Sequence, residues 1–157
     1  MSDPVELIER RVQAVLDGQR STQGLHLFCQ IGGRGLSGQD GGITTLQISG
    51  SGWALVGWRD GDDAEMFSHQ LSDADMRKIY GLLMRFPFWT ASPRKREREE
   101  NELNIHVRIS DQEKGISHGI QFYSDDAEEF PILKDLMQRI DSLISALSEG
   151  VIEGAQL

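Results

Sequence analysis

Short connections between apolar stretches constrain this chain more than any other feature of its sequence. Stretches 43–49, 53–59 and 65–70 are rich in β-branched, aromatic and aliphatic residues, and only three to five residues lie between consecutive stretches. A parallel pair of strands needs a crossover of a dozen or more residues, whereas a tight turn can join an antiparallel pair. Together with an earlier apolar stretch at 25–31, these segments therefore predict an antiparallel meander.

The remaining patterns complete a mixed fold. Alternating residues predict two further strands at 102–110 and 116–123, and helical periodicity predicts helices at about 4–17, from Ser72 to Phe86, and from Pro131 to Gly150. Ser72 followed three residues later by Asp75 is typical of a helix start. The resulting order, α-β-β-β-β-α-β-β-α, indicates an α+β fold with an antiparallel sheet of about six strands and helices packed on one face. We expect residues 1–150 to form a single domain and residues 151–157 to be a frayed tail.

The charge balance excludes several classes of partner. Sixteen Lys and Arg against 25 Asp and Glu give a formal net charge of −9. Such a surface repels nucleic-acid phosphates and anionic lipid head groups, so we expect neither a nucleic-acid nor a membrane partner. The N-terminal segment lacks the basic and apolar regions of a signal peptide, and Cys29, the single cysteine, is predicted to be buried. These features favour a cytoplasmic protein.

Two glycine motifs resemble catalytic or nucleotide-binding signatures, but both lie in the wrong context. Residues 33–38, GRGLSG, match G-x-G-x-x-G but lead to a strand, whereas a dinucleotide site needs a helix N-terminus there. Residues 115–119, GISHG, match the hydrolase turn G-x-S-x-G, yet a strand follows again and no later histidine could act as the base. We therefore predict no catalytic residues, and we interpret the glycines of 32–42 as a long hairpin loop.

Metal ligation is also not indicated. The four histidines have no neighbouring ligand at a spacing that forms a compact pair on one element. The acidic turn Asp60–Glu65 lacks the glycine and glutamate that an EF-hand loop requires. Strand alternation places His118 on the core side of its strand and His106 on the opposite side. No cofactor and no metal site are predicted.

Two clusters remain as candidate partner contacts. Residues 86–89, FPFW, gather three aromatic rings at a helix end, where they either pack under the following loop or anchor an interface. Residues 90–101 are predicted to form an exposed loop, whose basic run is either neutralised by nearby glutamates or binds an acidic peptide or a phosphate. The candidate residues are Phe86, Phe88, Trp89, Arg94, Lys95, Arg96 and Arg98.

The element order also resembles two families. The run GG…GITTLQISGSG, then LSDADMRKIYGLLMRFPFW, then a hairpin and a final helix, resembles emfourin-type protein inhibitors of metalloproteases. The order of three helices and a sheet, with an acidic surface, is also similar to that of class I type III secretion chaperones. Both resemblances imply a protein-binding module without catalysis.

The sequence thus predicts a non-enzymatic, acidic protein-binding module of inhibitor, chaperone or immunity type, with a homodimer as one available form. The alternative is a small-molecule-binding domain or an enzyme, with a pocket between sheet and helices lined by Trp53, Trp58, Arg59, His69 and His106. The identity of the partner, the oligomeric state, the order of strands and the roles of loops 32–42 and 90–101 stay open.

Overall fold

The computed structural model describes residues 3–32, 42–85, 87–93, 95–97, 99 and 102–148. It contains three helices, two short 3-10 helices and six strands within these residues. In chain order the elements are α1 (Pro4–Leu16), β1 (Leu25–Gly32), β2 (Ile43–Ser49), β3 (Trp53–Asp60), β4 (Asp63–Gln70), α2 (Asp73–Arg85), η1 (Phe88–Thr90), β5 (Asn104–Asp111), β6 (Ile116–Tyr123), η2 (Ser124–Glu128) and α3 (Pro131–Leu147).

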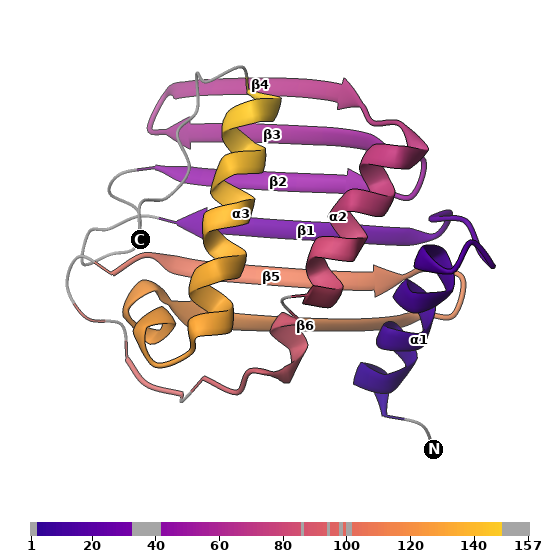
Figure 1. The fold of residues 1–157 in the computed structure, drawn as a ribbon. Coiled ribbons are helices and arrows are strands. Elements are labelled where there is room, and N and C mark those ends of the chain that lie inside the picture. The colour runs from indigo at the N-terminus through magenta and orange to yellow at the C-terminus, as the bar shows by residue number, and fades with distance from the viewer. Residues whose placement is uncertain are drawn as a thin grey trace.

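The six strands form one antiparallel sheet in the order β4-β3-β2-β1-β5-β6. The first four strands make the meander that their short turns predict. The chain then passes through α2 and returns to pair β5 with β1, and β6 follows at the edge. The first strand in sequence is therefore an inner strand of the sheet (Figure 1).

All three helices lie on the same side of the sheet (Figure 1), which confirms the predicted α+β architecture. Alternate residues of every strand point toward the helices, and on β1 these are Leu25, Leu27, Cys29 and Ile31, each no more than 5% exposed. Leu46 on β2 and Ile105 on β5 continue this layer with no exposed surface. The core therefore lies between the sheet and the helices.

Local capping explains where the first two long helices begin. The Asp3 carboxylate accepts a hydrogen bond from the Val5 amide at 3.0 Å, and Pro4 occupies the first helical turn. At α2, the Ser72 hydroxyl accepts from the Asp75 amide at 3.1 Å while the Asp75 carboxylate accepts from the Ser72 amide at 3.3 Å. This reciprocal pair is the capping box that the sequence predicts.

A buried ion pair fixes the position of α1 against the sheet. Arg11 Nε lies 3.2 Å from Asp111 Oδ2, and the two side chains are 3% and 0% exposed. The same guanidinium donates hydrogen bonds to the carbonyls of Ser21 and Gln23 at 2.9 and 2.8 Å. Sequence reasoning missed this pair because Arg11 and Asp111 are distant in sequence and each looks like an ordinary surface charge.

Some boundaries differ slightly from those expected. β5 begins at Asn104 and not at Glu102, because Glu102 is buried and its carboxylate accepts hydrogen bonds from the neighbouring loop. Phe86, the loop 33–41 and the C-terminal residues 149–157 lie outside the described residues, so the predicted loop and tail lie there too. Among the described helices, none combines the length and hydropathy needed to span a bilayer.

Candidate interaction surface

The sheet has a second face, which points away from the helices. The strand register places four residues of each strand on it, because successive side chains alternate between faces. We call this the open face and the helix-packed side the covered face. The open face consists of His26, Phe28, Gln30, Gly32, Ile43, Thr45, Gln47, Ser49, Trp53, Leu55, Gly57, Arg59, Ala64, Met66, Ser68, Gln70, Asn104, His106, Arg108, Ser110, Ser117, Gly119, Gln121 and Tyr123.

The open face carries no Asp or Glu, although the chain has 25 acidic residues. Its formally charged side chains are Arg59 on β3 and Arg108 on β5, and both are exposed. The acidic residues of β3 and β4, such as Asp60 and Glu65, occupy the alternate strand positions, which belong to the covered face. A neutral to positive surface thus lies on a strongly acidic protein.

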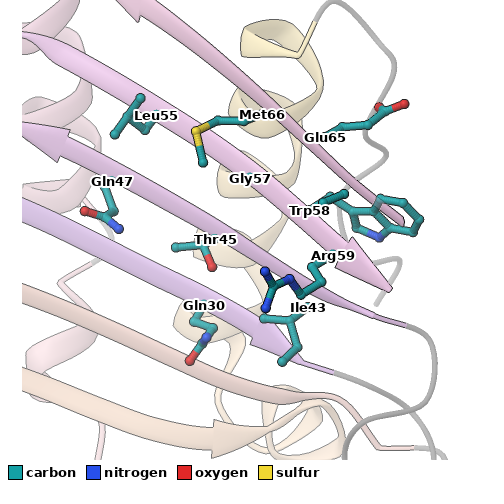
Figure 2. Close-up of a pocket in the computed structure, with 11 residues that line it drawn as sticks. Gln30, Ile43, Thr45, Gln47, Leu55, Gly57, Trp58, Arg59, Glu65 and Met66 are labelled. Atoms are coloured by element: carbon teal, nitrogen blue, oxygen red, sulfur yellow. The ribbon is translucent and has the colours of Figure 1, made fainter. Parts of the chain in front are cut away.

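A hollow of about 500 Å³ lies on the open face, and Gly57 forms part of its floor (Figure 2). Gly57 pairs with Thr45 on β2 and with Met66 on β4, so the gap lies within a row of side chains that crosses the strands. A Cβ atom placed on Gly57 would find its nearest neighbours, Glu65 O and Met66 Cε, 4.0 Å away. The missing side chain therefore leaves open space above the strand.

The walls of the Gly57 hollow combine apolar and polar groups. Leu55 and Met66 lie on one side, Thr45 on another, and Arg59 farther along β3 (Figure 2). Met66 is 73% exposed, which is unusual for a large apolar side chain. Trp53, at the other end of β3, is 44% exposed on the same face. Exposed apolar groups therefore gather along β3 and β4.

On the half of the open face formed by β1, β5 and β6, side chains pack more closely against one another. Phe28 and His106 make an edge-to-face contact with their ring centroids 5.9 Å apart. Gly119, another glycine of this face, lies beneath Arg108, and a Cβ there would meet Arg108 Cζ at 3.4 Å. Arg108 also donates a hydrogen bond to Ser117 Oγ at 3.2 Å. Burial, followed by the charge of Arg108, lowers the pKa of His106, which favours its uncharged form.

The aromatic cluster at 86–89 is part of the core. Phe88 is fully buried and Trp89 is 4% exposed, with their rings in edge-to-face contact at 5.1 Å. Trp89 Nε1 donates a hydrogen bond to Glu9 Oε1 on α1 at 2.7 Å. The packing role predicted for this cluster is therefore confirmed for Phe88 and Trp89, which offer no surface to a partner, while Phe86 lies outside the described residues.

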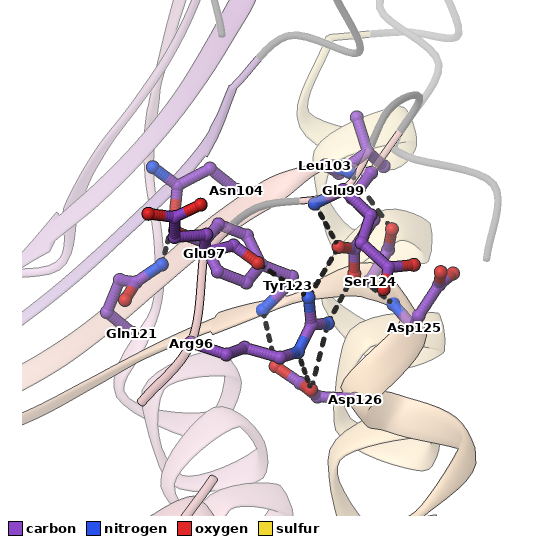
Figure 3. A network of polar contacts seen from close by, with 11 residues as sticks. Arg96, Glu97, Glu99, Leu103, Asn104, Gln121, Tyr123, Ser124, Asp125 and Asp126 are labelled. Carbon is purple, nitrogen blue, oxygen red and sulfur yellow. Dashed lines mark hydrogen bonds and ion pairs between the residues drawn. The ribbon is translucent and has the colours of Figure 1, made fainter. Parts of the chain in front are cut away.

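The basic loop is anchored to the molecule by Arg96 (Figure 3). The Arg96 guanidinium donates two hydrogen bonds to Glu102, at 2.7 and 2.6 Å, and two to Asp126 Oδ1, at 3.1 and 3.0 Å. It also lies 5.0 Å from the centre of the Tyr123 ring. Hydrogen bonding to Arg96 lowers the pKa of Glu102, and the carboxylates raise the pKa of Arg96.

This network shows neutralisation by Glu102 for Arg96, and it makes Arg96 a structural residue. Lys95 is exposed, and Arg94 and Arg98 lie outside the described residues. Carboxylate oxygens of Glu99, Glu102 and Asp125 lie within 4.8 Å of one another, an arrangement that can hold a cation. However, both Glu102 oxygens already accept hydrogen bonds from Arg96.

The residues of the predicted alternative pocket do not converge. The register places Trp53, Arg59 and His106 on the open face, while Trp58 and His69 have the parity of the covered face. Arg59 lines the Gly57 hollow and Trp58 contributes at its rim. The observed hollow thus lies on the opposite side of the sheet from the predicted position between sheet and helices.

The remaining reactive side chains lie apart from the open face. Burial, reinforced by the nearby Asp141 carboxylate, raises the pKa of the Cys29 thiol to about 12, so this buried cysteine stays protonated. His118 lies on the covered face as predicted, and burial lowers its pKa. Within the described residues, no hydrogen bond joins a histidine to a serine, threonine or cysteine side chain.

The sequence matches no protein-family model and no curated protein. Assignment of function therefore depends on the surface itself. Sequence reasoning did not single out the open face, although part of the signal was present: the outward positions of the predicted strands alternate with the apolar ones, and Glu102 is the one carboxylate among them. The open face is recognised only when the outward positions of all six strands are considered together.

Proposed function

We propose that this protein is a non-enzymatic binding module that contacts another protein through the open face of its sheet. The observation that carries the proposal is the absence of Asp and Glu from that face in a chain of net charge −9. Charged residues elsewhere on the molecule keep it soluble and repel like-charged partners. A face without such groups is easier to desolvate, because fewer ions lose their hydration on contact.

The exposed apolar groups of the open face support the same proposal. The centre of a protein interface is typically poor in charged residues and enriched in aromatic residues, Met and Arg. Trp53, Met66, Arg59 and Arg108 supply these residue types on one face. A cytoplasmic setting and the inhibitor-like or chaperone-like roles implied by resemblance stay part of the proposal.

Affinity capture with two matched charge-reversal variants tests this proposal. Arg59→Glu/Arg108→Glu changes the open face, whereas Arg77→Glu/Arg139→Glu makes the same change in net charge on exposed positions of α2 and α3. Each protein is immobilised on a resin and incubated with lysate of the source organism. The proteins that the resin retains are quantified by mass spectrometry.

We expect a partner that the wild-type protein and the helix-side variant retain equally and that the open-face variant loses. Equal retention by both variants, or equal loss from both, would show that binding does not depend on the open face and would overturn the proposal. Circular dichroism of each variant verifies that its fold is intact.

A further inference from the structure

We infer that the open face binds an extended acidic segment of its partner, one of whose large apolar side chains enters the Gly57 hollow. The inference rests on the proposed function and adds the chemistry of the occupant. It follows from three properties of the open face: the hollow, the two exposed arginines, and the distance between them.

The hollow suits a single large apolar side chain. Its floor is the backbone around Gly57, and its walls include Leu55 and the exposed thioether of Met66. Methionine is flexible and polarisable, and its sulfur makes favourable contacts with aromatic rings. The volume of about 500 Å³ is large enough for an aromatic side chain together with part of its backbone.

The arginines select for acidic residues beside that anchor. Arg59 lies two residues beyond Gly57 on β3, which places the two Cα atoms about 7 Å apart along the strand. Arg108 lies on β5, separated from β3 by β2 and β1, or about 14 Å across the sheet. Planar guanidinium groups bind carboxylates through paired hydrogen bonds. Glu65, from the opposite alternation of β4, also lines the hollow (Figure 2), but among the described residues no ion pair joins it to Arg59.

The spacing of the arginines sets the length of the segment. Arg59 and Arg108 are offset by four positions along the strands, so the direct path between them is about 20 Å. An extended chain covers this distance with about six residues. We therefore expect one acidic residue within about two positions of the apolar anchor and a second about five positions away on its other side.

Electrostatics also disfavours a second copy of this chain on the open face. In a two-fold dimer the same surface is present on both subunits. Two open faces in contact would bring Arg59 and Arg108 of both copies together with no open-face carboxylate to balance them. An acidic heterologous segment supplies the missing charges.

A phage-displayed library of random 12-residue peptides tests the inference. Peptides are selected on the wild-type protein and counter-selected on Gly57→Val, whose side chain projects into the hollow from its floor. The nearest neighbours of the added Cβ, Glu65 O and Met66 Cε, are 4.0 Å away. Ser110→Val is the matched control, because it adds the same side chain to the open face on β5, which contributes no lining residue. Ser110 pairs with His26, four residues along β1 from the lining residue Gln30. Selected sequences are then synthesised and titrated against each protein by isothermal calorimetry.

We expect the selected peptides to contain a large apolar residue and at least two acidic residues. Their affinity should fall about tenfold or more for Gly57→Val, stay unchanged for Ser110→Val, and fall several-fold when the acidic residues are replaced by Asn and Gln. Met66→Ala, at an exposed wall position, is a second test of the hollow that does not depend on how Gly57→Val folds.

Three results would overturn the inference: no peptide enriched above counter-selection, equal affinity for wild type, Gly57→Val and Met66→Ala, or no loss on neutralising the acidic residues. Size-exclusion chromatography at the titration concentrations shows whether a second copy occupies the face instead, which would also overturn it. If lysate capture depends on Arg59 and Arg108 while the peptides fail, the proposed function stands and only the extended occupant is wrong.

Discussion

Gly57 and Gly119, two glycines of the open face, have opposite surroundings. Above Gly57 the nearest atoms to a Cβ lie 4.0 Å away, whereas at Gly119 the Val107 carbonyl lies at 3.2 Å and Arg108 crosses above it. Both glycines lack a side chain on the same face of one sheet, yet only one leaves a hollow. The difference shows that a glycine in a strand creates a site only where its neighbours leave the space empty.

The same contrast holds between the two faces as a whole. On the inner strands, covered-face residues such as Leu46 and Ile105 have no exposed surface, and the buried Asp111 of β5 is paired with Arg11 of α1. Residues of the open face are partly exposed and largely uncharged. If the covered face determines stability and the open face determines binding, substitutions on the two faces must have separable effects.

The largest effect is expected at the buried ion pair. Asp111→Ala leaves Arg11 buried without its carboxylate, and breaking such a pair lowers the free energy of unfolding by about 3–5 kcal/mol. Glu113→Ala, which breaks the exposed pair with Arg20, should cost less than about 1 kcal/mol. Urea denaturation followed by circular dichroism measures both, and equal losses would contradict the distinction between buried and exposed charges.

Adjacent residues of β2 provide the second test. Leu46 on the covered face is 0% exposed, so Leu46→Ala should lower the free energy of unfolding by about 2–5 kcal/mol. Gln47→Ala, one residue along and on the open face, should change it by no more than about 0.5 kcal/mol. A loss at Gln47 as large as that at Leu46 would mean that the open face is also part of the folding core.

The third test concerns the ion pair between Glu102 and Arg96, which lies beside Tyr123 where the basic loop reaches the open face. Replacing Glu102 by Gln removes charged hydrogen bonds to Arg96 and should destabilise the protein by about 1.5–3 kcal/mol at neutral pH. The folded-state pKa of Glu102 lies below its usual value of 4.5. Its contribution is therefore complete above about pH 4.5 and is lost as the pH falls toward the folded-state pKa.

Denaturation midpoints at neutral pH and at about pH 3 distinguish this behaviour. The difference between wild type and Glu102→Gln should shrink as the pH falls. A difference that stays constant over that range would indicate that Glu102 contributes by packing and not by charge.

The smallest effect is expected at the two glycines. Gly57→Ala should raise the free energy of unfolding by about 0.5–1 kcal/mol, because it restricts the unfolded chain and meets no atom in the folded one. Gly119→Ala should gain less, since its Cβ crowds the Val107 carbonyl. Thermal melting of the two variants measures the contrast, and equal gains would imply that the two positions are equally open.

Sequence patterns predicted the architecture well, because turn length, helix capping and the alternation of apolar residues in strands are all local properties of the chain. The short turns at 50–52 and 61–62 left no room for a parallel crossover, and Ser72 with Asp75 marked the start of α2. The pairing of β5 with the inner strand β1 was beyond reach, because it depends on contacts between segments far apart in the chain.

The candidate site was predicted less well, for a related reason. Aromatic density drew attention to Phe88 and Trp89, yet the same property makes such residues pack in a core. Charge density drew attention to Arg96, which binds Glu102 and Asp126. The Gly57 hollow is defined by an absent side chain between β2 and β4, and only the strand register shows which neighbours surround it.

The Met66 methyl group offers the most direct test of the central claim that the open face binds a partner. Protein labelled with ¹³C at the methionine methyl groups is added to lysate of the source organism, and its methyl spectrum is compared with that in buffer. Met76 and Met137, which are 1% and 0% exposed, serve as internal controls. We predict that the Met66 resonance shifts or broadens while those of Met76 and Met137 stay unchanged. A Met66 resonance that is unaltered in a lysate from which the same protein captures a specific partner would contradict the account.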